Sequence, residues 1–175
     1  MKKLLGIAFL VLSFTQVQAQ EWETPVIEGY GKIINLKDAA VQPDPTLQYN
    51  LLFDIHDDKE REGVNEGLWK VARTLNMLAA AGVPSEKIKI VTAIHGPASF
   101  FSLNNVKYQE KYNKDNPNLE LLSLLKKQGV KLYVCGQATS ALGITDANMN
   151  EYVEKALSAI SVLANYQLQG YIVIP

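Results

Sequence analysis

The chain has one cysteine, Cys135, among its 175 residues. A single cysteine cannot form a disulfide within the chain, so a disulfide-stapled fold is excluded. The sequence also contains no G-x-G-x-x-G, Walker A or G-x-S-x-G stretch. The Gly-rich phosphate-binding loops and the nucleophile elbow of α/β-hydrolases are therefore absent from the sequence.

An excess of positive charge is missing as well. The chain carries 17 Lys and Arg residues against 18 Asp and Glu residues, a formal net charge of −1. Because nucleic acids are bound through a basic face, we expect no nucleic-acid partner. The hydrophobic content of 47% with 20% charged residues is that of an ordinary globular domain.

The longest apolar run lies at the N-terminus. It covers residues 4–14, follows Lys2 and Lys3, and precedes Val17-Gln18-Ala19. This pattern predicts a signal peptide over residues 1–19, with a buried first helix as the alternative. The run is short for a transmembrane span, so we expect no stable membrane insertion and a periplasmic or secreted protein. Without Lys2 and Lys3, 15 basic residues face 18 acidic ones, a net charge of −3.

Export is testable on the protein from its native host. N-terminal sequencing should begin at or near Gln20, because cleavage is expected after Ala19. Recovery of the chain with Met1 in a membrane fraction would contradict this prediction.

Residues 20–48 are expected to form an extended N-terminal arm. Pro43 and Pro45 disfavour helix in the residues before them, and a short strand pair is expected around Gly29 and Gly31. The arm is either loose or packed on the body or on a neighbouring subunit. Packing is favoured, and with it a homo-oligomer, because the arm contains apolar residues that need burial: Trp22, Val26, Ile27, Tyr30, Ile33 and Ile34.

Residues 49–175 read as one domain in which strands and helices alternate. Strands have central apolar runs, and helices have apolar residues at three- and four-residue spacing. The alternation predicts an α/β fold with a mainly parallel sheet. Residues 104–118 are expected to be a lid or, alternatively, a surface helix with a loop. The expected strands cover residues 49–55, 87–95, 130–134 and 170–174; the expected helices cover residues 64–79, 98–103, 119–127 and about 147–165.

Cys135 stands where the strand over residues 130–134 ends. Gly136 and small polar residues follow, as at the start of a helix. Ligands bind at the carboxyl ends of parallel strands, and a helix N-terminus favours thiolate. The thiol is either buried and inert, accessible and reactive, or paired between chains.

Several stretches together resemble the DsrE/DsrF-like family, the sulfur-relay proteins with a YchN-like fold. They are Ile94-His95-Gly96-Pro97, residues 129–136 around Cys135, Gly143-Ile144 and residues 169–175. The resemblance covers roughly residues 49–175. It implies a flavodoxin-like or YchN-like layered sandwich, a persulfide on Cys135, and an oligomer, since relatives commonly form trimers or hexamers. A homotrimer is expected for this chain.

The candidate site consists of residues at strand ends. Both histidines of the chain, His56 and His95, follow expected strands, as Cys135 does, and a parallel sheet brings such ends to one edge. Cys135 and His95 are the candidate catalytic residues, and Gly136, Gln137 and His56 are expected to contact the substrate. The long spacings give only a weak metal signal, so no metal and no cofactor are expected.

Two functions are compatible with these residues. In the first, an exported sulfur carrier or sulfurtransferase exchanges sulfur with a donor or acceptor protein through Cys135. His95 would stabilise the thiolate or move a proton, and backbone N–H groups would hold the anion. In the second, the domain is a non-catalytic binding or assembly module, and Cys135 is structural.

Overall fold

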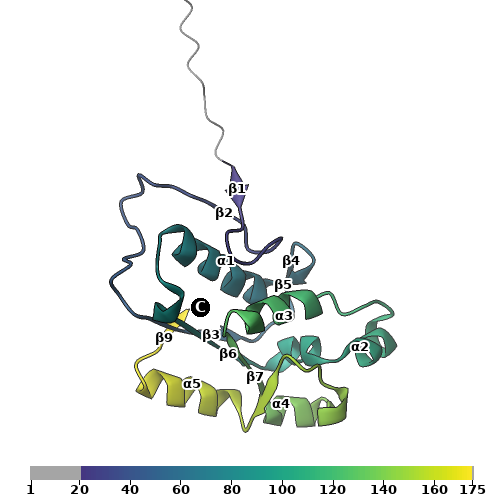
Figure 1. The fold of residues 1–175 in the computed structure, drawn as a ribbon. Helices are drawn as coiled ribbons and strands as arrows, with labels where there is room; N and C mark the ends of the chain where they lie inside the picture. The colour runs from purple at the N-terminus through teal and green to yellow at the C-terminus, as the bar shows by residue number, and fades with distance from the viewer. Residues whose placement is uncertain (1–20, 175) are drawn as a thin grey trace, which may run out of the picture.

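The structure, a computed structural model, describes residues 21–174. Its centre is a five-stranded sheet in the order β8-β7-β6-β3-β9, and all neighbouring strands are parallel. Figure 1 shows helices on both faces of this sheet. The α/β sandwich with a parallel sheet is therefore confirmed. The strands are β3 (Tyr49–Ile55), β6 (Ile88–Ile94), β7 (Lys131–Cys135), β8 (Glu154–Ala156) and β9 (Ile172–Ile174).

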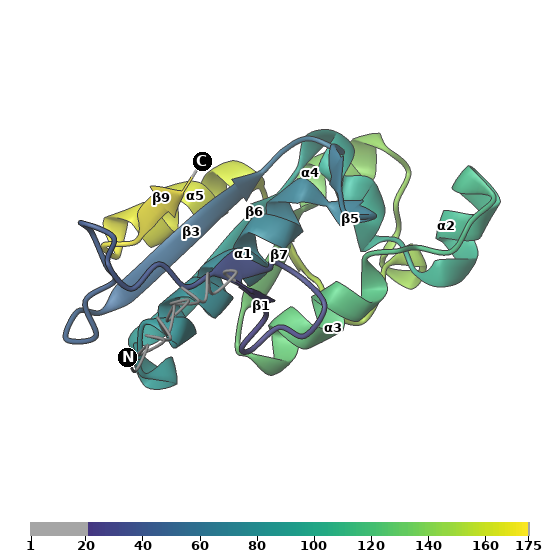
Figure 2. The ribbon, with the colours of Figure 1, turned by 90° about the horizontal axis from the view of Figure 1, so that it is seen from above.

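The two faces of the sheet have separate cores. On one face, α1 (Glu66–Ala80) and α3 (Leu119–Lys127) pack on β3 and β7, and on the other face lies α5 (Ala159–Leu168) (Figures 1 and 2). Strand residues alternate between the faces: Phe53 belongs to the core under α1, whereas Leu52 belongs to the core under α5. The remaining elements are β1 (Trp22–Glu23), β2 (Ile33–Ile34), β4 (Glu60–Arg61), β5 (Val64–Asn65), α2 (Asn105–Tyr112), α4 (Gly136–Ala141) and three short 3-10 helices, η1 (Ser85–Lys87), η2 (Gly96–Ser102) and η3 (Asp146–Asn148).

Outside residues 147–165, the expected elements are present with small shifts. Helix α1 begins at Glu66 because Asn65 caps it, with Oδ1 accepting from the backbone N–H of Gly67 at 2.9 Å. Residues 104–118 contain α2 followed by a loop, which is the second of the two alternatives. Among residues 21–174, no helix combines the length and the apolar character required to cross a membrane.

The predicted helix over residues 147–165 is wrong. The segment forms η3, strand β8 and, after Ser158, helix α5. Asn150 is buried and its Nδ2 donates to the carbonyl of Ser102 at 2.8 Å, while its Oδ1 accepts from Tyr152 N at 3.0 Å. The tertiary hydrogen bond to Ser102 and the local one from Tyr152 replace helical ones, so the chain stays extended and adds a fifth strand beside β7. The predicted inward stripe of Met149, Tyr152, Val153, Ala156, Ile160 and Leu163 is therefore divided between different elements.

The arm packs in part on its own chain. Strands β1 and β2 pair antiparallel, as expected around Gly29 and Gly31, and Ile27 and Ile33 are buried. Gly31 has φ +61°, and a Cβ there would lie 2.2 Å from Arg73 N, so the arm backbone lies directly on α1. Trp22, in contrast, is 56% exposed. The proposed contact of the arm with a neighbouring subunit stays a prediction.

Candidate functional site

His56, His95 and Cys135 lie in one row at the carboxyl edge of the sheet. Ile55 pairs with Ile94 and Ile94 with Val134, so the next residues of these strands are neighbours. The backbone N–H of His95 donates to Ile55 O at 2.9 Å, which continues the hydrogen-bond ladder past the strand ends. Cys135 packs in the core under α5, and the alternation of strand residues places the row on that face.

The histidines contact each other and an aspartate. His95 Nε2 lies 2.7 Å from Asp54 Oδ1, and the ring centroids of His56 and His95 are 4.9 Å apart in an edge-to-face arrangement. Within residues 21–174, no hydrogen bond joins either ring to Cys135 Sγ. The His95 ring is thus held toward β3, one strand away from the thiol.

Asp54 was not identified from the sequence. It follows the apolar residues Leu51, Leu52 and Phe53 just before the end of β3, and its side chain is exposed. The sequence feature that could have identified it is an acidic residue near the end of an apolar strand, two residues before His56. Its partner is the imidazole of the neighbouring strand, and a carboxylate on one ring nitrogen fixes which nitrogen is free for proton transfer.

The Cys135 thiol is buried rather than open, with the residue 6% exposed. It occupies the N-cap position of α4, and the backbone N–H of Ala138 donates to Sγ at 3.4 Å. Burial raises the pKa of the thiol, but hydrogen bonds from the backbone N–H groups of Ala138, Ala159 and Gln137 and from the Ser158 hydroxyl outweigh it. The pKa of Cys135 is therefore lowered from its ordinary value.

These donors come from two helix N-termini. Gln137 and Ala138 open α4, and Ser158 and Ala159 open α5. The sequence predicted a helix start after Cys135, which is that of α4. It did not predict the start of α5, because Ser158 lay inside the helix predicted over residues 147–165. The convergence of the two helix starts concentrates positive partial charge at the sulfur.

Gly136 and Gln137 bring α4 close to the loop before α5. A Cβ at Gly136 would lie 2.8 Å from Ala156 O, so glycine leaves room for the backbone of β8. The side chain of Gln137 donates from Nε2 to Leu157 O at 3.3 Å. Both residues thereby hold the β8–α5 connection against the thiol.

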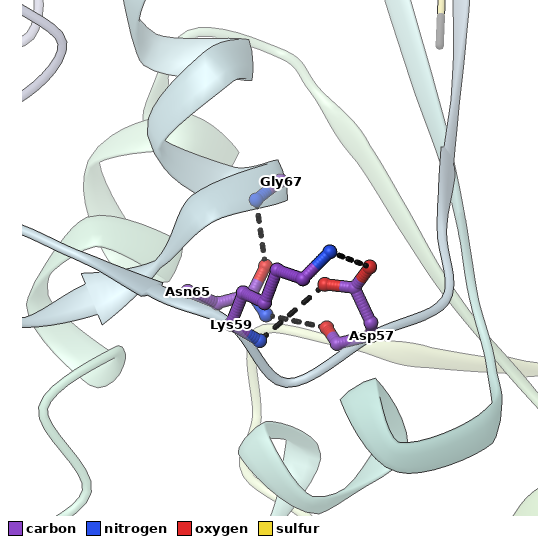
Figure 3. Close-up of polar contacts among 4 residues, drawn as sticks. All are labelled: Asp57, Lys59, Asn65 and Gly67. Carbon is purple, nitrogen blue, oxygen red and sulfur yellow. Dashed lines mark hydrogen bonds and ion pairs between the residues drawn. The ribbon is translucent and has the colours of Figure 1, made fainter.

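A pocket of about 180 Å³ lies beyond His56, where β3 and β9 end. At this point of the sheet, β6 lies on one side of β3, and β9, the last strand of the described chain, lies on the other. Ligands commonly bind at such switch points in α/β folds. On its wall, Lys59 Nζ lies 3.4 Å from Asp57 Oδ2. Asn65 holds this loop to the start of α1 (Figure 3): its Nδ2 donates to Asp57 O at 2.9 Å, and its Oδ1 accepts from the backbone N–H of Gly67. Neither Cys135 nor His95 lines this pocket. In the described part of the chain, no three His, Cys, Asp or Glu side chains are grouped to hold a metal ion.

Comparison with known proteins agrees with the resemblance seen in the sequence. The sequence model of the DsrE/DsrF-like family matches residues 63–175, which include His95 and Cys135 but not His56. A similar solved structure is MTH1491 from Methanobacterium thermoautotrophicum, described as a protein of unknown function. It has 19% identity and a TM-score of 0.54, covering 72% of this chain and 97% of the other. No curated protein matches significantly. The family match extends over more than half of the sequence, and the chain belongs to the DsrE/DsrF-like family.

Proposed function

We propose that the protein is a sulfur carrier or sulfurtransferase in which Cys135 accepts and passes on a sulfur atom. The observation that carries the proposal is the position of Sγ at the start of α4, where the backbone N–H of Ala138 donates to it at 3.4 Å. Hydrogen bonds from this N–H, those of Ala159 and Gln137 and the Ser158 hydroxyl lower the pKa of the thiol. Such donors favour thiolate, which is the nucleophile in sulfur exchange. Membership of a family that includes sulfur-relay proteins supports the same chemistry.

In the proposed step, the Cys135 thiolate attacks the outer sulfur of a donor persulfide. A new S–S bond forms on Cys135, the S–S bond of the donor breaks, and the donor cysteine leaves as thiolate and takes up a proton. One sulfur atom moves with no net gain or loss of electrons. Attack by an acceptor thiolate on the outer sulfur of the Cys135 persulfide then reverses the process. The N–H groups that favour the thiolate also suit the anionic persulfide.

His95 is the proposed proton carrier. It stands on the strand next to Cys135, and Asp54 engages its Nε2, which leaves Nδ1 available for the proton. Because no hydrogen bond joins this ring to Sγ, the thiol proton would reach Nδ1, and return to the departing donor, through an intervening water. We further propose that this exchange takes place outside the cytoplasm, on the basis of residues 1–19. Those residues lie outside the part that the structure describes.

One observation favours a second candidate function. Cys135 packs with Ala93, Ala159 and Val162 in the smaller core, and such a residue can serve as an inert hydrophobic side chain. The protein would then be a binding or assembly module on the same fold. The two functions differ in the reactivity of the folded thiol.

Alkylation of the folded protein with iodoacetamide over a pH series separates the two functions. We expect stoichiometric modification whose rate has a midpoint below about 8.5, the ordinary pKa of a cysteine thiol. Ser158→Ala should move the midpoint upward, because one donor to the sulfur is lost. Asn165→Ala, an exposed change farther along α5, is the matched control and should leave the midpoint unchanged. Modification only after denaturation would favour the second function.

A further inference from the structure

A second, smaller pocket lies between α2, η2 and the segment that follows β3. Its volume is about 30 Å³, and neither Cys135 nor His95 lines it. Its walls combine aromatic rings with carboxylates, two kinds of group that both attract cations. The residues that give the pocket this character are Phe100, Tyr108, Tyr112, Asp58 and Glu60.

The aromatic rings form one cluster. Tyr108 and Tyr112 are four residues apart on α2, so they share a face of the helix, and their ring centroids are 4.6 Å apart. The Phe100 ring stands nearly perpendicular to that of Tyr112, with the centroids 6.1 Å apart. Lys111 Nζ lies 4.1 Å from the centroid of the Phe100 ring and 5.4 Å from that of Tyr112. The cluster therefore already attracts one ammonium group, which the chain itself supplies.

The buried hydroxyl of Tyr108 has no partner. Tyr108 is 7% exposed, and within residues 21–174 its hydroxyl makes no hydrogen bond. Burial raises the pKa of Tyr108, and the charges of Glu60 and Asp58 raise it further, so the hydroxyl end of the ring faces the carboxylate side of the pocket. Because a buried phenol ordinarily has a hydrogen-bond partner, a ligand that donates to this oxygen would supply what is missing.

Of the two carboxylates, Asp58 is the one available to a ligand. Glu60 Oε1 pairs with Lys114 Nζ at 3.3 Å, whereas Asp58 has no ion pair in the described part of the chain. The amides in the pocket wall are engaged as well: Asn118 Oδ1 accepts from the backbone N–H of Asn65 at 2.7 Å. One carboxylate and the buried hydroxyl thus remain, and both accept hydrogen bonds.

We propose that this pocket binds a primary alkylammonium group. Such a group carries three N–H donors, which suit Asp58 and the Tyr108 hydroxyl, and its charge lies against the rings of Tyr112 and Phe100. At roughly 10–15 Å³ for each water-sized group, a volume of about 30 Å³ has room for a –CH₂–NH₃⁺ end and is too small for a trimethylammonium group. The rest of the ligand extends into solvent.

Titration of the full chain with n-butylammonium chloride tests the proposal, followed by the ring-proton NMR signals of Tyr108 and Tyr112 at constant ionic strength. We expect saturable binding in the millimolar range, and none of n-butanol, which has a similar size and no charge. Tetramethylammonium should bind at least about tenfold more weakly, because it has no N–H donor. The methylamide of N-acetyl-lysine distinguishes the sources of the group: binding equal to that of butylammonium assigns the pocket to lysine side chains as well as free amines, and weaker binding assigns it to free amines.

Four variants test the named contacts. Asp58→Asn should weaken binding at least about fivefold, because the charge facing the ammonium group is lost. Asp38→Asn makes the same change at an exposed position of the arm and should have no effect. Tyr108→Phe keeps the ring and removes the hydroxyl, so it should weaken binding about threefold. Lys111→Gln should tighten binding, because it removes a like charge from the aromatic cluster.

Two results would overturn the proposal. Equal affinities of Asp58→Asn and Asp38→Asn, with circular dichroism unchanged, would show that the pocket does not hold the cation. Binding to Lys111→Gln alone would show that Lys111 already fills the aromatic cluster in the natural chain. Neither result bears on Cys135, whose reactivity is measured separately with iodoacetamide.

Discussion

Cys135→Ser is expected to abolish sulfur loading completely. Wild-type protein incubated with glutathione persulfide should gain the mass of one sulfur atom, and the variant should gain none. Hydrogen bonds at residue 135 lower the pKa of the thiol and so favour the thiolate, and no other cysteine exists in the chain to accept sulfur. Intact-mass spectrometry before and after treatment with dithiothreitol measures the effect, since a persulfide is reduced and a stable adduct is not.

Two controls make this result specific. Serine is close to cysteine in size, so circular dichroism of Cys135→Ser should match that of the wild type. Ser158→Ala keeps the thiol but removes one of its donors, so it should still load, at a lower rate near neutral pH. Loading of Cys135→Ser at the wild-type level would exclude Cys135 as the acceptor.

Asn76→Ala should destabilise the protein by about 2–4 kcal/mol. Asn76 is fully buried in α1 and makes four hydrogen bonds to the arm. Its Oδ1 accepts from Val26 N and Ile27 N, both at 2.9 Å, and its Nδ2 donates to Tyr30 O at 2.9 Å and Gly31 O at 3.1 Å. Alanine leaves these four backbone groups without partners unless the arm leaves α1 and exposes Ile27.

Urea unfolding measures this change. Asn165→Ala is a suitable comparison, because Asn165 is an exposed residue of α5 and its loss should cost no more than about 0.5 kcal/mol. Limited proteolysis should cut the arm of Asn76→Ala faster than that of the wild type. An equal effect of the two substitutions on the free energy of unfolding would show that the arm contributes little to the fold.

Much of the fold followed from local sequence patterns. The apolar runs at residues 49–55 and 87–95 gave β3 and β6 to within one residue, because strands buried on both faces leave a continuous apolar signal. The segment after residue 146 could not be predicted in this way. Its conformation depends on hydrogen bonds from Asn150 to carbonyls almost 50 residues earlier, and no local pattern reports such partners.

The site was predictable to the extent that it depends on strand ends. The order of the strands places His56, His95 and Cys135 in one row at the edge of the sheet, and each could be placed at the end of its strand. Ser158 and Ala159 were missed since their contact with the thiol exists only if the chain breaks between β8 and α5. Asp54 was missed because its partner, His95, is 41 residues away along the chain.

Whether Cys135 carries sulfur is tested most directly by the mass of the protein isolated from its native host without reductant. We expect a fraction of molecules to be heavier by one sulfur atom, with the addition located on Cys135 and removed by dithiothreitol. A uniformly unmodified chain whose thiol reacts with iodoacetamide only after denaturation would contradict it.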